Sequence, residues 1–553
     1  MNRHAAGPAG AVLITVALLG ALAAAPLVEL ARIAAGNGWG AALTALGDSQ
    51  NLEALVHTVV LGAVVTAASV VCGTAAALAV ERRPPRERRV LRLTLAAPLL
   101  LPEFVLGFSW SQAYGPAGYT DHYLHVQLPG LLGPVGIAVA LTAHALPLAY
   151  LAAAVALAAR PTRDLERAAR ASGAGPAAVL RTVTLPALRT PLLAAAALVF
   201  VTCVNSFAIP AVLGTPAGFS TMSTLVYDDL NLSADPDSFR QLAVVALGMA
   251  ALVLAVVGAA DLTLGHVPRT LIWSGARADD EAPRPRRQGW TIRVAVGAYT
   301  LLAAGIPLLV LVADAITRGP GISPVPAHWT LANFGSALAG ETVPALLRSL
   351  ALAAAAAILI PLMSLAVITA GRGLRGPLGT AVTLAYAVLG SALAVGVLIA
   401  YGRWFTGTAL IILVAYLGKF WALGHRPIAA AAARIDPALA RAARAGGARP
   451  ATAWRTAELP GIRAALAAAG ALVLVFATHE LTMSSILYGP GSQTLAVVVL
   501  DQQQLGQVGA TSALALILSV PPLIAALALA RLQRRRQSVA PRRAPSAMAA
   551  STT

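Results

Sequence analysis

Residues 166–186 read ERAARASGAGPAAVLRTVTLP, and residues 440–460 read ARAARAGGARPATAWRTAELP. The two stretches align without a gap, and thirteen of their 21 positions are identical. The step from position 166 to position 440 is close to half of the 553 residues in the chain. A repeat at this distance is typical of a duplicated unit that fills each half of a sequence. We therefore expect a fold built from two copies of one module.

The composition of the chain excludes a water-soluble globule. The chain is 58% hydrophobic and 11% charged, with a mean hydropathy of +0.74, whereas soluble domains carry about a quarter charged residues. Twelve apolar runs reach the roughly 20 residues that a helix needs to cross a bilayer. They lie at about 9–31, 55–80, 91–113, 131–158, 190–213, 241–265, 292–316, 345–370, 378–400, 407–425, 462–487 and 509–530. The sequence thus predicts an all-α polytopic membrane protein with about twelve transmembrane helices.

The apolar runs divide into six for each copy of the repeat. An even number of spans gives both copies the same orientation, so we expect two parallel six-helix repeats. The expected parts are a first module at 1–266, a cytoplasmic linker at 267–290, a second module at 291–531 and a disordered tail at 532–553. We expect the first run to remain as a span rather than to be a cleaved signal peptide.

Arginine placement predicts the orientation of these spans. Lys419 is the only lysine, so 39 of the 40 basic residues are arginine. With both termini in the cytoplasm, 34 of the 39 arginines fall in cytoplasmic segments, as the positive-inside rule requires. The repeated stretches then lie in the longest cytoplasmic loops between spans, at about 160–189 and 426–463. This topology and the anionic lipid of the inner leaflet account for the net charge of +17, so we expect no nucleic-acid partner.

Each repeated stretch is expected to form a helix, a bend and a second short helix. Gly173 and Gly447 mark the bend, while Leu185-Pro186 and its counterpart Leu459-Pro460 are expected to end the second helix before the next span. Small alanine side chains would let the backbone of another protein come close. A plain re-entry loop with arginines for topology is the simpler alternative. It leaves the gap-free spacing of the repeat unexplained, so we favour a docking surface.

Both stretches resemble the E-A-A-x3-G-x9-I-x-L-P motif of permease subunits from binding-protein-dependent ABC importers. In copy one the residues at the motif positions are Arg167, which follows Glu166, and Ala168, Ala169, Gly173, Val183, Leu185 and Pro186. In copy two they are Arg441, Ala442, Ala443, Gly447, Ala457, Leu459 and Pro460. Both copies depart from the motif by carrying arginine at its acidic position, and Ala440 replaces Glu166 in copy two.

The resemblance covers nearly the whole chain, as two fused permease modules, and the layout is most similar to the iron(III)-type permeases. It implies that the two loops dock on two copies of an ABC ATPase subunit and that an extracytoplasmic solute-binding protein delivers the cargo. It also implies a multi-pass protein of the bacterial inner membrane with no cofactor and no catalytic residue. Thiamine, polyamine and phosphonate importers are the alternatives. Lys419 does not fit a phosphate-binding loop, so ATP hydrolysis is expected in a separate subunit.

Two polar pairs stand at matching places inside the apolar runs. His479 and Glu480 lie in the eleventh run, and the repeat spacing places them opposite Asn205 and Ser206 in the fifth. An ionised side chain at mid-bilayer costs about 2.5–3.5 kcal/mol on insertion scales, so such groups face a bundle interior or water. We expect both pairs to line the pathway between the modules. Hydrogen bonding between helices, without contact to cargo, is the alternative.

The remaining polar residues in and between the runs predict structural roles. We expect Glu103 near an outer helix end, His144 as a satisfied core histidine, and Asp121, His122 and His125 in a solvated loop rather than a metal site. The H-E-x-x-H zinc motif is excluded because Met483 takes the place of its second histidine. Two other classes stay open, a gradient-driven secondary transporter and a membrane-embedded enzyme. The first would show more charges within the spans, and the second a cluster of Asp, Glu or His at one membrane face.

Overall fold

The computed structural model describes residues 6–36, 40, 44, 47–158, 160–232, 236–264, 289–370 and 372–539. Over these residues the chain forms helices and one isolated bridge between Thr317 and Trp329, with no extended strand. Nine helices in the same ranges are long and apolar enough to cross a membrane, or ten if one bent pair counts as a span. The predicted all-α polytopic membrane fold is confirmed.

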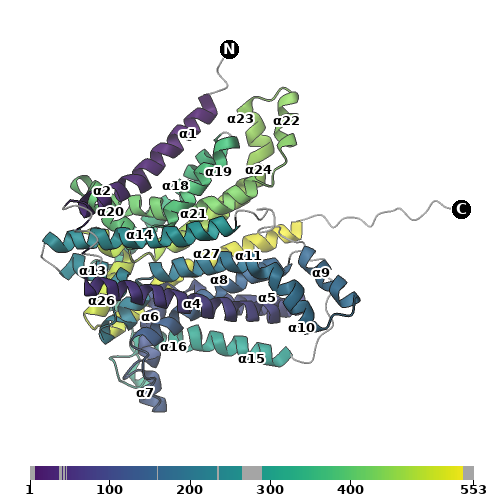
Figure 1. Cartoon of the computed structure of the whole chain (residues 1–553). Helices are drawn as coiled ribbons and strands as arrows, with labels where there is room; N and C mark the ends of the chain where they lie inside the picture. Colours follow the sequence, from purple (N-terminus) through teal and green to yellow (C-terminus); the bar gives the residue numbers. More distant parts are fainter. Residues whose placement is uncertain are drawn as a thin grey trace.

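The first half of the chain forms the first module, with α-helices (α) and 3₁₀- or π-helical turns (η). Its elements are α1 (Ala6–Leu19), η1 (Gly20–Ala24), α2 (Ala25–Ala34), α4 (Ser49–Val80), α5 (Pro85–Ala96), η2 (Ala97–Leu100), α6 (Glu103–Tyr114), α7 (Tyr119–Leu124), α8 (Pro134–Ala158), α9 (Arg160–Ala171), α10 (Pro176–Val179), η3 (Leu180–Thr184), α11 (Leu185–Asn205), α12 (Ala208–Leu213), η4 (Thr215–Ala217), α13 (Met222–Leu232) and α14 (Pro236–Leu264). Helices α4, α8, α11 and α14 run side by side through the molecule (Figure 1).

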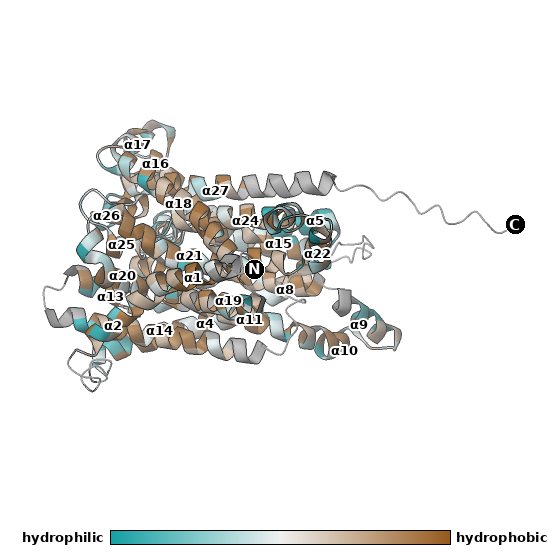
Figure 2. Ribbon diagram, turned by 90° about the horizontal axis from the view of Figure 1, so that it is seen from above, coloured by the Kyte–Doolittle hydropathy of each residue, from teal (hydrophilic) through white to brown (hydrophobic). Residues whose placement is uncertain are grey.

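The second half repeats this series. Its elements are α15 (Gly289–Thr300), η6 (Leu301–Gly305), α16 (Ile306–Ile316), η7 (Pro326–His328), α17 (Ala332–Ala337), α18 (Thr342–Thr369), α19 (Arg372–Ala387), α20 (Gly390–Phe405), α21 (Ala409–Ala432), α22 (Pro437–Ala445), α23 (Pro450–Ala453), η8 (Trp454–Glu458), α24 (Leu459–Thr478), α25 (Ser484–Leu487), α26 (Leu495–Gln504) and α27 (Val508–Val539). Hydrophobic residues cover most of the bundle, and hydrophilic residues gather at its ends (Figure 2).

The long helices of the two modules follow in the same order, although η7 and α17 of the second module have no counterpart among the described residues of the first. Helices α8 and α21 end at Ala158 and Ala432, which is the same spacing as in the sequence repeat. The ends of α4 and α18, at Val80 and Thr369, are farther apart along the chain than this spacing. The difference arises because the first module carries α7 and a following loop between α6 and α8, where the second module has a short connection.

The apolar runs at 91–113 and 378–400 do not form single helices, so this part of the sequence prediction was wrong. In the first module the chain bends by 91° between 85–100 and 103–124. Pro98 and Pro102 lie at this break, and neither has a backbone N–H to continue an α-helix. In the second module the break falls at Leu389, whose backbone is extended. Each module therefore has a broken helix in the middle of its apolar region.

The first helical segment of each module packs on the other module. Helices α1 and α2 contact α18, α19 and α20, while α15 and α16 contact α5 and α6. A π-turn in each segment leaves carbonyl groups free to accept hydrogen bonds across the boundary. Tyr401 Oη donates to the Ala21 carbonyl at 2.5 Å. Trp110 Nε1 donates to Ala303 at 3.0 Å and Tyr114 Oη to Leu302 at 2.7 Å. The modules are therefore interlocked rather than merely adjacent.

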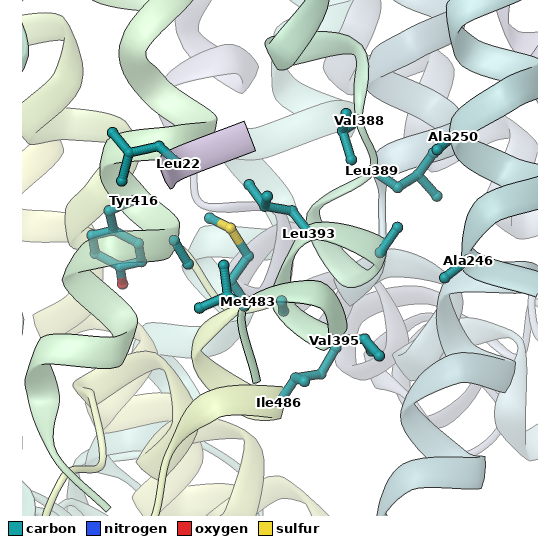
Figure 3. Close-up of a cluster of buried hydrophobic side chains, with 14 of the residues drawn as sticks. Leu22, Ala246, Ala250, Val388, Leu389, Leu393, Val395, Tyr416, Met483 and Ile486 are labelled. Carbon is teal, nitrogen blue, oxygen red and sulfur yellow. The ribbon is translucent and has the colours of Figure 1, made fainter. Parts of the chain in front are cut away.

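The hydrophobic core crosses the boundary between the modules. Figure 3 shows Leu22 of the first module approaching Tyr416 and Met483 of the second. The same view shows Ala246 and Ala250 of α14 facing residues of α20 and α25. Because both halves contribute to one core, neither module buries its apolar faces alone.

Two predicted segments lie at the edge of the described structure. Helix α27 continues to Val539, so the first residues of the predicted disordered tail at 532–553 are helical. Of the predicted linker at 267–290, residues 267–288 lie outside the described residues, and residues 289 and 290 begin α15.

Candidate translocation pathway and coupling loops

The two repeated stretches adopt the same local structure. Helix α9 ends in a turn at Gly173, with φ +86°, and α22 ends in a turn at Gly447, with φ +85°. The Gly173 N–H donates to the Arg170 carbonyl and the Ala174 N–H to the Ala169 carbonyl, both at 3.0 Å. The second copy repeats both bonds one for one. This is the Schellman motif, which needs a left-handed residue and so favours glycine. The predicted bend is present in both copies.

The predicted helix end at Leu185-Pro186 is wrong, and so is its counterpart at Leu459-Pro460. The helix that starts at Pro176 continues without a break to Asn205, and the one from Pro450 continues to Thr478. Both prolines follow a π-turn, in which the N–H groups bond five residues back; the Leu185 N–H donates to the Leu180 carbonyl. The shifted ladder has room for a residue without an N–H. Each loop is therefore continuous with a membrane helix.

The motif residues of the two loops have matching exposure. Arg167, Ala168, Gly173 and Pro186 are exposed, while Ala169 is half-buried. In the second copy Arg441, Ala442, Gly447 and Pro460 are exposed and Ala443 is half-buried. Leu185 is exposed and Leu459 half-buried. Figures 1 and 2 show α9 and α22 at the same end of the molecule. The two exposed faces are therefore available together, although their docking role stays a prediction.

Glu166 is the exception in the first loop, because its side chain turns inward. The residue is 9% exposed. Its carboxylate accepts hydrogen bonds from Thr184 Oγ1 at 2.6 Å and from an Arg170 guanidinium nitrogen at 2.8 Å. Arg82 lies 3.8 Å from the same carboxylate. Glu166 thus holds the loop to its own module instead of facing a partner.

Asn205 lies at the end of α11 and joins the two modules. Its Oδ1 accepts hydrogen bonds from the Gly390 N–H at 3.0 Å and from Lys419 Nζ at 2.7 Å. Both donors belong to the second module. Ser206, the next residue, donates to Glu103 Oε2 at 2.8 Å within the first module. The first predicted polar pair is therefore at the module boundary.

The second predicted pair lies at the end of α24. Glu480 accepts hydrogen bonds from the backbone N–H groups of Met483 at 2.7 Å and Ser484 at 3.0 Å, and from Ser484 Oγ at 3.0 Å. The centroid of the His479 ring lies 5.9 Å from that of the Phe476 ring. The first predicted pair therefore bonds across the module boundary through Asn205, whereas the bonds of Glu480 go to its own segment.

Lys419 is the functional candidate that sequence reasoning missed. Its Nζ donates to the Val388 carbonyl at 2.6 Å, at the break between α19 and α20. His144 has a similar place in the first module, where Nδ1 lies 3.2 Å from the Pro98 carbonyl beside the other break. Each broken helix is therefore capped by a polar side chain from the following long helix. The sequence feature that could have indicated this role is that the only lysine of the chain lies within an apolar run.

Asp121, His122 and His125 lie on and directly after α7. Among the described residues no group of three or more His, Cys, Asp and Glu side chains is arranged to hold a metal ion. His122 and His125 are exposed on and after α7.

Acidic residues gather at the end of the bundle opposite α9 and α22, where Figures 1 and 2 place α13 and α26. Asp228 and Asp229 lie on α13 and Asp501 on α26. Burial raises the pKa of all three carboxyl groups above its ordinary value.

Comparison with known proteins gives a family match and several relatives. Residues 69–264 match the family described as "Binding-protein-dependent transport system inner membrane component". A probable ABC transporter permease of Sinorhizobium fredii is 28% identical over 310 residues, 54% of this chain and 53% of the relative. The thiamine transport system permease of Brucella abortus is 27% identical over 369 residues, 66% of this chain and 64% of the relative. Its Escherichia coli counterpart is 28% identical over 300 residues, 53% and 52% respectively.

The matches span less than two thirds of the length of these relatives. The family match covers the first coupling loop, α11 with Asn205 and the first module as far as α14. Residues 69–264 are therefore similar to an inner membrane component of a binding-protein-dependent transport system.

Proposed function

We propose that this chain is the permease component of an ABC importer, with both modules in one polypeptide. The observation that carries the proposal is the continuity of each loop with the pathway. The helix from Pro176 to Asn205 has 30 residues, and the helix from Pro450 to Thr478 has 29. At 1.5 Å per residue each is about 45 Å long. A push on either loop therefore reaches the module boundary through one unbroken helix.

The partners follow from this arrangement. Each loop would dock on one copy of an ATPase subunit, and a solute-binding protein would deliver the cargo at the end formed by α13 and α26. The arginine bias and the family description support an inner-membrane protein with both termini in the cytoplasm. The chain itself has no catalytic role in this proposal, since ATP hydrolysis takes place in the partner.

The boundary between the modules would form the pathway. Lys419 and Gly390 bond to Asn205 across the boundary. Separation of the modules must break both bonds and expose the buried amino group of Lys419 to water. A two-state pathway of this kind is biased by any ligand that binds one state better, here ATP through the ATPase pair.

The cargo is a small solute, and thiamine and iron(III) are the two candidates we propose to test first. The names of several relatives among those matched favour thiamine. The iron(III) hypothesis rests on the layout of two fused modules in one chain. Polyamines and phosphonates are further cargo classes for the same assay.

Co-purification and reconstitution test the proposal. The tagged chain, isolated from membranes of its host, should carry an ABC ATPase. Proteoliposomes with the complex and its binding protein should take up labelled thiamine or labelled ferric iron only with ATP, and a protonophore should not abolish uptake. Uptake that follows an ion gradient without ATP would favour a secondary transporter and refute the importer. A product formed by the isolated chain would instead indicate a membrane-embedded enzyme.

A further inference from the structure

A buried polar network joins three helices at the end of α4 in the first module. Glu81, 7% exposed, follows the last residue of α4. It accepts hydrogen bonds from Tyr150 Oη of α8 at 2.7 Å and from Arg92 Nε of α5 at 2.8 Å, and a second Arg92 nitrogen also contacts it. Charge-assisted bonds with this many partners fix both distance and direction. Helices α4, α5 and α8 are thereby fastened together at the coupling-loop end.

The next residue connects this network to the first coupling loop. Arg82 lies 3.8 Å from the buried Glu166 carboxylate of α9. Glu166 in turn accepts from Thr184 at the start of the long helix and from Arg170. Arg82 thus contacts the loop, and the adjacent Glu81 bonds to helices α5 and α8.

The network also leads toward the pathway. Helix α5, held by Arg92, continues through η2 to the break that precedes Glu103. Glu103 accepts the hydrogen bond from Ser206 at the module boundary. A displacement of the first loop therefore has a second route to the pathway besides the helix from Pro176 to Asn205.

The second module does not repeat the four polar side chains of this network, although Arg375 Nε of α19 donates to the Ala370 carbonyl at 2.9 Å and the buried His425 of α21 lies beside Gly379. The end of α18 corresponds to the end of α4, which places Ala370 opposite Glu81. The starts of α6 and α20 place Gly379 opposite Arg92, and the spacing of the sequence repeat places Gly424 opposite Tyr150 and Ala440 opposite Glu166. Four polar side chains are thus replaced by alanine or glycine at matching positions.

Apolar contacts hold the second loop instead. Trp454 of η8 and Ile435 before α22 pack on a small cluster that contains Ile428 and Ile462. Leu180 occupies the place of Trp454 in the first module. Apolar contact is non-directional, because its strength follows buried area rather than angle. Among the described residues, the second loop has no ion pair that corresponds to those of Glu166 with Arg82 and Arg170.

We propose that Glu166 is a positioning residue that makes the first coupling loop move as one body with α4, α5 and α8, so that the two loops transmit force unequally. The second loop follows its ATPase subunit through its single long helix. This inference rests on the proposed importer function. It assigns tight coupling to the first loop and looser coupling to the second.

The test compares two carboxylates of α9 in the full complex. Glu166→Gln keeps the size of the side chain and removes its charge. Asp164→Asn makes the same chemical change at a nearby position, where the side chain is 70% exposed and pairs with Arg167 at 3.9 Å. The measurement is cargo taken up per ATP hydrolysed in proteoliposomes. We expect a fall of at least about fivefold for Glu166→Gln, the lower end of ordinary coupling between sites, and less than about twofold for Asp164→Asn, which lies below that range.

A second readout does not depend on transport. Amide hydrogen exchange of the purified chain should accelerate over residues 164–184 in Glu166→Gln and stay unchanged over 438–458. Arg82→Gln, at a side chain that is 53% exposed, provides a variant that is expected to fold and should shift both readouts in the same direction by less.

The outcomes separate the inference from the function. If the wild-type complex performs ATP-driven uptake and Glu166→Gln matches Asp164→Asn in both readouts, the positioning role is refuted. If the wild-type chain shows no ATP-driven uptake, the importer proposal fails, and hydrogen exchange alone decides whether Glu166 braces the loop. An equal rise in exchange over both loops would also overturn the proposed inequality.

Discussion

Replacement of Gly173 and Gly447 by alanine should uncouple ATP hydrolysis from uptake. A Cβ built at either glycine meets no heavy atom within 4 Å, so steric clash with neighbours contributes nothing. The cost is conformational, because φ is +86° and +85°, and a left-handed residue with a Cβ costs about 1–2 kcal/mol. That free energy disfavours each native turn by a factor of roughly 5–30. The native orientation of the loop surface that we propose to dock on the ATPase should then be less populated than in the wild type.

Gly175 provides the matched control for this experiment. It lies two residues after Gly173, also has no atom within 4 Å of a built Cβ, and has φ −68°. The second copy carries Arg449 at this position, so a side chain fits. Gly175→Ala should therefore leave coupling unchanged. Gly173→Asn is a second control, since asparagine tolerates the left-handed region better than alanine does.

The assay is uptake per ATP hydrolysed by the reconstituted complex, with co-purification of the ATPase as a check on assembly. We expect Gly173→Ala and Gly447→Ala to lower the ratio, and the double variant to lower it further. If the double variant couples as well as Gly175→Ala, the turn geometry is not what transmits force, and the role given to both loops is wrong.

Three further predictions concern other parts of the molecule. Asn205→Leu removes a hydrogen-bond acceptor from Lys419, which should destabilise the contact between the modules by about 1–3 kcal/mol. An amine-reactive reagent should then label this sole lysine more strongly, as measured by peptide mass spectrometry. Unchanged labelling would contradict the role of Asn205 at the module boundary. Tyr114→Phe should lower the melting temperature by the loss of one hydrogen bond worth about 0.5–1.5 kcal/mol, whereas Tyr123→Phe, at an exposed tyrosine, should not. Burial raises the pKa of Asp501 in the folded chain, so protonated Asp501 contributes its full stabilisation below its unfolded pKa of about 3.9, and this stabilisation is lost as pH rises through the higher folded pKa. The wild-type melting temperature should therefore fall between these two pH values, and Asp501→Asn should make that fall smaller. An equal fall in both proteins would refute the raised pKa of Asp501.

The sequence predicted the helical class and the repeat, because hydropathy and a gap-free duplication are local signals. It also predicted the glycine turns, since glycine between a helix and a Gly-Pro or Arg-Pro pair is a helix-end signal. It did not predict the breaks at Pro102 and Leu389, because both lie inside apolar runs that read as continuous spans. The π-turns before Pro186 and Pro460 were missed for a related reason, since proline ordinarily indicates a helix start.

The roles of polar residues were harder to predict than their positions. Glu166 was expected at a docking surface because it stands beside the motif, yet it is buried against Thr184. The orientation of the Glu166 side chain also depends on Arg82, which follows the end of α4 and is distant in the sequence. Lys419 was considered only in relation to phosphate binding, because no local pattern links it to Asn205. Contacts between distant segments decide these roles, and a single sequence without them leaves the choice open.

Fusion of the two modules allows a boundary contact to occur on one side only. In a symmetric pair of identical modules, a contact from residue i to residue j occurs twice, because j of one copy also meets i of the other. Here Ala145 occupies the position that matches Lys419 in the first module, and the side chain that meets the lysine amino group is the Asn205 amide. Divergence of the two copies thus makes possible a single lysine contact that bridges the modules, whereas an unfused symmetric pair would form each such contact twice.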